Sequence, residues 1–158
     1  MDNFYTSTEA AQITGCSRRQ LQYWREKGVV VPTVNPSGKG RNVYYSEVDL
    51  LKLTVMEYLL SIGLSFEFCR EALETLKVKE SWLFDDSVPS QKMKRLMFLV
   101  TESQEQKFKL AEFDKKIALE AFCQGQAVVP FWGDRVRERL SENLKNFQRS
   151  LSVKLGSA

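Results

Sequence analysis

The sequence predicts an α+β protein with two unlike halves. Three observations predict this class. Residues 6–77 contain helical segments with capping residues, interrupted by a stretch rich in Pro, Ser and Gly. Residues 95–132 contain short apolar runs of strand length, and residues 133–151 have an apolar side chain every three or four positions. A chain of 158 residues is long enough for one domain or two small ones.

Two short helices joined by a tight turn are predicted near the N-terminus. The first, residues 6–15, opens with the sequence Thr-Ser-Thr-Glu, which suits a capping box. The second, residues 16–28, has Ser17 as its cap and directs Leu21 and Trp24 toward the core. Two helices so joined form a helix-turn-helix, in which the second helix enters the major groove of DNA.

Basic side chains are concentrated in one short segment. Residues 18–41 contain six lysines and arginines and a single acidic residue, Glu26, in a chain whose net charge is only +3. Such a patch is the electrostatic footprint of a nucleic-acid contact, and the alternative is a solvated surface. Arginine suits guanine edges and phosphates, glutamine suits adenine, and tyrosine suits phosphates. The candidate DNA-binding residues are Arg18, Arg19, Gln22, Tyr23, Arg25, Lys39 and Arg41.

A hairpin and two further helices are predicted next. Residues 29–46 are expected to form two short strands around a loop that carries Lys39 and Arg41. A hairpin of this kind acts as a wing on the DNA backbone or in the minor groove. Serines suited to capping precede the helices predicted over residues 46–63 and 65–77.

These segments resemble, in order, the winged helix-turn-helix domain of the MerR family over residues 4–76. The resemblance rests on Tyr5–Thr6, Gly15 with Ser17, Arg19-x-Leu21-x-Tyr23-Trp24, Gly28, Tyr45-Ser46-x-x-Asp49-Leu50 and Ile62-Gly63-Leu64-Ser65. It implies DNA contacts from Arg18, Arg19 and Tyr23, with wing contacts from Lys39 and Arg41. The whole chain also resembles the small MerR-type repressors that accompany CRISPR-associated transposons in cyanobacteria.

The sequence departs from the family pattern at two positions. Val43 stands where the family usually has its wing arginine, so Arg41 or Lys39 is expected to substitute from a longer wing. Arg25 stands where the family often has an acidic residue, and we expect it to add a phosphate contact.

The second half is predicted to be a small α/β dimerisation or effector domain. Strands are expected at residues 95–101, 107–113 and 126–132, with helices at 114–125 and 133–151. The inward side chains are predicted to be Ile117, Ala121 and Phe122 in the first helix, and Val136, Leu140, Leu144, Phe147 and Leu151 in the second. Pro130 is expected either to confine its strand to an edge or to end it early. The expected division is residues 1–77 for DNA binding, a linker at 78–92, and the second domain at 93–158.

Several classes of function are disfavoured by what the sequence lacks. It has no histidine, and its three cysteines, Cys16, Cys69 and Cys123, form no CxxC pair, which argues against a zinc site or a disulfide framework. We expect Cys16 and Cys123 to be buried and inert. No catalytic constellation, cofactor or metal site is predicted, so we expect no enzymatic activity. No apolar run approaches a membrane span and the N-terminus has no signal-peptide pattern, so we expect a cytoplasmic protein with no membrane partner.

The predicted function is a homodimeric repressor that binds a palindromic promoter site on double-stranded DNA. One module of this size makes few contacts, and two-fold pairing doubles them. Because the family's usual coiled coil and sensor cysteines have no counterparts here, direct repression is favoured over ligand-triggered activation. Two alternatives stay open: an excisionase-like factor that bends DNA, and a regulator with a small-molecule site in the C-terminal domain.

Overall fold

The computed structural model describes residues 3–36, 42–103 and 105–156. It divides the chain into two compact units. The helical unit comprises Met1–Phe84 together with Val136–Ala158, and the sheet unit comprises Asp85–Arg135. This division differs from the ranges expected from the sequence, because the C-terminal helix groups with the first unit and not with the strands. The α+β class is confirmed.

The helical unit contains the predicted helices in the predicted order. They are α1 (Ser7–Thr14), α2 (Arg18–Glu26), α3 (Glu47–Ser61), α4 (Phe66–Lys79) and α6 (Gly133–Gly156), whose first turn belongs to the sheet unit. Strand β1 (Phe4–Tyr5) pairs antiparallel with β2 (Tyr45–Ser46). The capping box at Thr6 forms as expected, and Gly15 ends α1 in the left-handed conformation with φ 81°. Ser17 caps α2 as expected, and Gln20 completes a capping box there.

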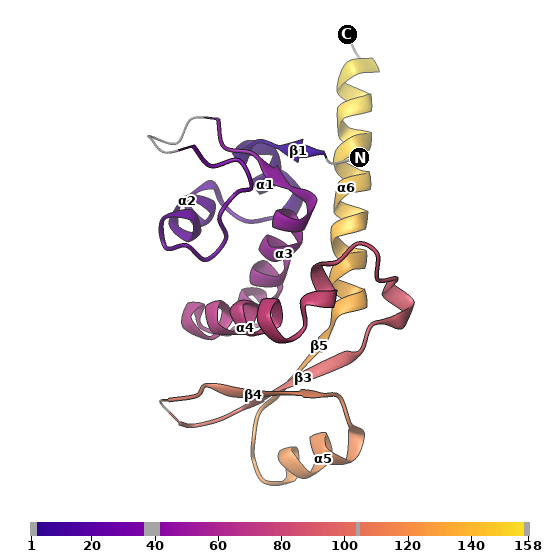
Figure 1. Ribbon diagram of the computed structural model, residues 1–158. Coiled ribbons are helices and arrows are strands. Elements are labelled where there is room, and N and C mark those ends of the chain that lie inside the picture. Colours follow the sequence, from indigo (N-terminus) through magenta and orange to yellow (C-terminus); the bar gives the residue numbers. More distant parts are fainter. Residues whose placement is uncertain (1–2, 37–41, 104, 157–158) are drawn as a thin grey trace. The chain divides into compact units, whose positions relative to one another are not determined.

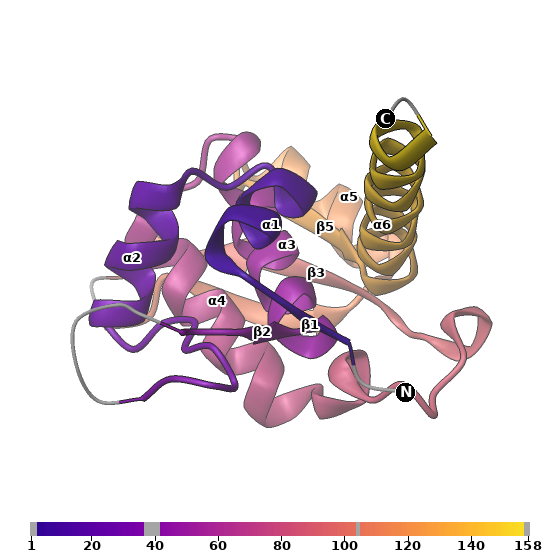
Figure 2. The same ribbon diagram turned by 90° about the horizontal axis from the view of Figure 1, so that it is seen from above.

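Helix α3 forms the centre of this unit. Leu50, Leu53, Met56 and Leu59 are fully buried, and α1 and α4 both pack on α3 (Figures 1 and 2). Helices therefore cover α3 from more than one side. The segment expected to be a linker, residues 78–92, begins inside α4 and continues into the short 3-10 helix η1 (Ser81–Phe84), in which Leu83 is fully buried. A second 3-10 helix, η2, spans Ser90–Lys92 in the sheet unit.

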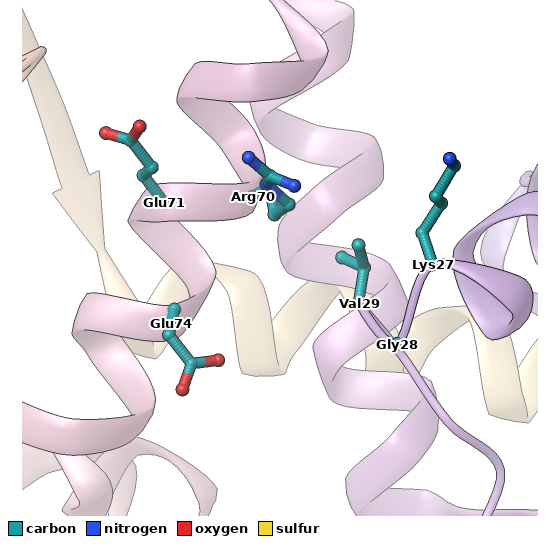
Figure 3. Close-up of a pocket in the computed structure, with 6 residues that line it drawn as sticks. All are labelled: Lys27, Gly28, Val29, Arg70, Glu71 and Glu74. Atoms are coloured by element: carbon teal, nitrogen blue, oxygen red, sulfur yellow. The ribbon is translucent and has the colours of Figure 1, made fainter.

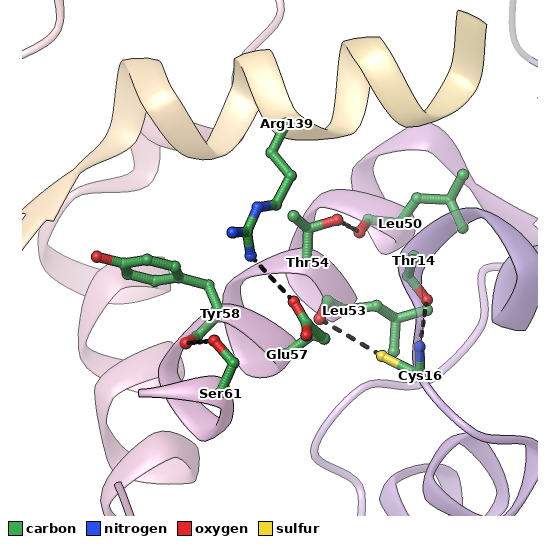
Figure 4. A network of polar contacts seen from close by, with 9 residues as sticks. All are labelled: Thr14, Cys16, Leu50, Leu53, Thr54, Glu57, Tyr58, Ser61 and Arg139. Carbon is green, nitrogen blue, oxygen red and sulfur yellow. Dashed lines mark hydrogen bonds and ion pairs between the residues drawn. The ribbon is translucent and has the colours of Figure 1, made fainter. Parts of the chain in front are cut away.

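Two arginines attach α6 to the rest of the helical unit. Arg137 donates through Nε and Nη2 to the Leu83 carbonyl oxygen at 3.0 and 2.8 Å. Arg139 pairs with Glu57 of α3 at 3.1 Å, as Figure 4 shows, and its guanidinium lies 5.6 Å from the centre of the Tyr58 ring. The apolar stripe predicted for the helix at residues 133–151 is only partly buried. Val136, Leu140 and Phe147 are buried, Leu144 is half-buried and Leu151 is exposed.

The sheet unit is a three-stranded antiparallel sheet with one helix. Strand β3 (Arg95–Val100) lies between β4 (Phe108–Glu112) and β5 (Val128–Trp132), so Pro130 lies on an edge strand as predicted. Helix α5 (Lys115–Cys123) packs through Ala118 and Ala121 against Met97 and Leu99.

The prediction for the inner face of α5 was wrong in part. Ala121 is buried, but Ile117 and Phe122 are exposed and Ala118 takes the inward position. Two alanines let the helix approach the sheet closely, so the larger apolar side chains remain at the flanks. None of the helices in the described ranges is both long and apolar enough to span a membrane.

Candidate nucleic-acid interface

The second helix of the helix-turn-helix presents one fixed polar face. Leu21 and Trp24 are buried, and the Trp24 carbonyl accepts a 2.8 Å hydrogen bond from the Val29 amide just beyond the helix. Because these contacts fix the rotation of α2 about its axis, the side chains opposite them face outward. Four of the candidate residues are exposed there: Arg18, Arg19, Gln22 and Tyr23.

Contacts within the unit orient two of these side chains. Arg18 donates through Nη1 to the Thr8 hydroxyl of α1 at 2.7 Å. Gln22 donates through Nε2 to the Glu26 carboxylate at 3.1 Å, one turn further along α2. To contact an adenine, the Gln22 amide must therefore either break its hydrogen bond to Glu26 or donate to the carboxylate and the base together.

Arg25 has a different environment from the one expected. It is half-buried, and its Nε donates to Asn35 Oδ1 at 2.7 Å. Asn35 lies just before the wing tip, next to the bridge in which the amides and carbonyls of Val34 and Tyr44 pair at 3.0 and 3.1 Å. Arg25 thus ties α2 to the base of the wing.

The wing base is also attached to α3, through a buried carboxylate. Asp49 is only 3% exposed, and its Oδ2 accepts the Thr33 amide at 2.7 Å and the Ser46 amide at 2.9 Å. The Thr33 hydroxyl lies 2.6 Å from the same oxygen. Thr33 lies in the first arm of the wing and Ser46 is the last residue of the second arm, so one carboxylate holds both arms at the base. The two wing residues predicted to contact DNA, Lys39 and Arg41, lie outside the described residues.

Tyr23 lies between an aromatic ring and a cation. Its ring meets Phe66 of α4 edge-to-face, with ring centroids 5.4 Å apart and an interplanar angle of 60°. Lys27 Nζ lies 5.7 Å from the Tyr23 ring centre. The contact between Tyr23 and Phe66 was not predicted from the sequence, since these residues are far apart along the chain and belong to no shared periodic pattern.

A small pocket lies next to Lys27. Lys27, Gly28 and Val29, after α2, line it on one side, and Arg70, Glu71 and Glu74 of α4 line it on the other (Figure 3). Its volume is about 230 Å³, below the range of most ligand sites. The ionic groups of its lining balance in charge, and Arg70 and Glu74 pair with Glu67 and Lys77 on the same helix.

The cysteines have two kinds of surroundings. Burial raises the pKa of Cys16 to about 11 and that of Cys69 to about 12, so both thiols stay protonated at neutral pH. Figure 4 shows Cys16 beside Thr14, with its Sγ 3.8 Å from the Leu53 carbonyl oxygen. Cys123 is exposed on α5, contrary to our expectation.

Comparisons with known proteins match the helix-turn-helix part of the chain. Residues 5–76 match the family model described as MerR HTH family regulatory protein. Similar curated proteins include three described as uncharacterized HTH-type transcriptional regulators, one from Mycobacterium bovis and two from strains of Mycobacterium tuberculosis. Each is 36% identical over 74 residues, which are 46% of this chain and 33% of the relative, so the match spans about a third of their length. Residues 5–76 of this chain form a MerR-family helix-turn-helix regulatory domain.

Proposed function

We propose that this protein is a sequence-specific DNA-binding transcription regulator that acts as a homodimeric repressor on a palindromic promoter site. The observation that carries the proposal is the outward polar face of α2, with Arg18, Arg19 and Tyr23 on a helix whose rotation is fixed by buried Leu21 and Trp24. The family of residues 5–76, and the description of the similar proteins as transcriptional regulators, support DNA binding and transcription regulation.

Each residue of this face has a distinct role in the proposal. Arg19 contacts a base edge in the major groove, because arginine pairs bidentately with guanine. Arg18 and Tyr23 contact phosphates and so set the position of α2 on the duplex. Lys39 and Arg41 add phosphate contacts from the wing. Arg25 supports the wing base through Asn35, which makes it an indirect contributor.

Homodimerisation is supported by exposed apolar side chains near the C-terminal end of α6. The apolar stripe that is buried at Val136, Leu140 and Phe147 continues to Leu151, which is 41% exposed, and to Leu155, which is 81% exposed. A second copy that packs along this continuation would bury both leucines. Two-fold pairing then places two copies of α2 on successive major grooves, about 34 Å apart.

Repression requires nothing of the protein beyond occupancy of a promoter. A dimer bound across a promoter element excludes polymerase by overlap, and affinity for the operator is what a basic α2 and wing supply. The two units then have separate roles, with the helical unit binding DNA and the sheet unit available for other contacts.

The proposal is tested by selection of binding sites from random duplex DNA, together with the mass of the free protein and of the complex. We expect one palindromic motif, with half-sites a helical turn or a multiple of it apart, bound by a dimer. Transcription in vitro from a promoter carrying the motif should fall as protein is added. Arg19→Ala should weaken binding to the selected motif. Arg149→Ala, which removes an exposed arginine of α6, is its matched control and should bind as the wild type does. Selection that returns no motif would reject sequence-specific binding, and unchanged or increased transcription would reject repression.

A further inference from the structure

We propose that Phe66, the first residue of α4, is a positioning residue that holds Tyr23 in the orientation in which its hydroxyl meets DNA. The inference rests on the proposed function of α2. Phe66 itself contacts no DNA in this account. It acts through the ring of Tyr23, which it meets edge-to-face at 5.4 Å.

The start of α4 gives Phe66 a fixed place. Ser65 caps the helix by accepting the Phe68 amide at 3.1 Å, and its carbonyl accepts the Cys69 amide at 3.0 Å. Phe68 and Cys69 are buried in the core, so the first turn of α4 is anchored. Phe66 is half-buried and makes its ring contact with α2. The anchored first turn of α4 therefore fixes the position of the Phe66 ring, and this ring in turn restricts the Tyr23 side chain on α2.

Tyr23 needs such support because it is otherwise open to solvent. The side chain is 44% exposed, and an exposed tyrosine on a helix samples two χ1 rotamers, at about 180° and about −60°. The edge contact with Phe66 and the Lys27 ammonium 5.7 Å from the ring centre favour a single arrangement. The Tyr23 side chain therefore has the orientation needed for the DNA contact before DNA binds.

The expected effect follows from the population of that arrangement. If removal of the Phe66 ring lets Tyr23 spread over both rotamers, the competent fraction falls about twofold per subunit, and affinity falls with it. A dimer uses two such sites, so operator affinity should fall about fourfold in Phe66→Leu.

A double-mutant cycle tests the proposal. Operator affinity is measured by fluorescence anisotropy for the wild type, Phe66→Leu, Tyr23→Phe and the double variant, on a DNA site selected with the wild type. We expect Phe66→Leu to lose about fourfold in the wild type and less than twofold when the Tyr23 hydroxyl is already absent. Phe66→Tyr keeps an aromatic edge and should restore near wild-type affinity. Phe122→Leu, at an exposed phenylalanine of α5, is the matched control and should leave affinity unchanged.

Equal losses from Phe66→Leu in both backgrounds would overturn the positioning role, as would a failure of Phe66→Tyr to restore affinity. A thermal melt of each variant shows whether the fold is kept. If Phe66→Leu melts early, the same cycle with Phe66→Met, which also lacks the aromatic edge, decides the question. If Arg19→Ala weakens binding but Tyr23→Phe does not, the positioning role fails while the proposed function stands. If neither variant weakens binding, the proposed function of α2 fails as well.

Discussion

Removal of the Asp49 carboxylate should loosen both arms of the wing and destabilise the helical unit. In Asp49→Ala, the amides of Thr33 and Ser46 lose the acceptor that lies 2.7 and 2.9 Å from them. The Thr33 hydroxyl loses a partner at 2.6 Å. The lost contact with the Ser46 amide is the Asp49 half of the capping box at the start of α3.

The size of the loss follows from these three contacts. A buried donor left without a partner costs about 1–3 kcal/mol, and bonds to a charged group lie toward the upper end. Thr33 is an exposed residue, so water can reach part of the vacated site and lower the cost. We therefore expect Asp49→Ala to lose about 2–4 kcal/mol of unfolding free energy. Asp49→Asn keeps one acceptor oxygen and should lose about half as much.

Urea unfolding followed by circular dichroism at 222 nm measures this loss, with a thermal melt beside it. A cost of 2–4 kcal/mol corresponds to a fall in Tm of roughly 5–15 °C for a chain of this size. Asp86→Ala is the matched control, since Asp86 is an exposed aspartate of the sheet unit and its removal should change stability by less than about 0.5 kcal/mol. An Asp49→Ala protein that unfolds at the wild-type midpoint would refute the reasoning.

Three further predictions concern the wing, the dimer and the thiols. Lys39→Ala and Arg41→Ala should each lower the salt slope of DNA binding by about one unit per subunit, measured by titration at several salt concentrations; unchanged slopes would remove the wing from the interface. Leu155→Glu should shift sedimentation toward the monomer, and an intact dimer would locate the contact elsewhere. A thiol reagent at pH 8 should modify Cys123 quickly and the two buried cysteines only on unfolding, because burial raises their pKa; three fast thiols would contradict that burial.

Features determined by neighbours in sequence were predictable. The caps at Thr6, Ser17 and Ser46 each depend on a residue three positions further along, so local patterns identify them. The edge placement of Pro130 was predictable for a similar reason, since a proline lacks the amide that a central strand needs. The outward placement of Arg19 followed from the buried positions on its own helix.

Features that join distant segments were not predictable from one sequence. Asp49 enters the sequence prediction only as a member of the motif Tyr45-Ser46-x-x-Asp49-Leu50, and its contact with Thr33 spans 16 positions. The grouping of α6 with the helical unit depends on Arg137 and Arg139, whose partners lie 54 and 82 positions away. The inner face of α5 was misassigned because periodicity favours large apolar side chains, whereas close packing on the sheet selected alanines.

The central claim is that the outward face of α2 specifies the DNA sequence. The most direct test measures affinity for every single-base substitution of the selected site, with the wild type, Arg19→Ala and Arg149→Ala. We expect Arg19→Ala to lose about 1–3 kcal/mol on the parent site and to lose its preference at one base pair of each half-site, while Arg149→Ala matches the wild type. An Arg19→Ala profile that keeps the wild-type preference at every position would contradict the claim.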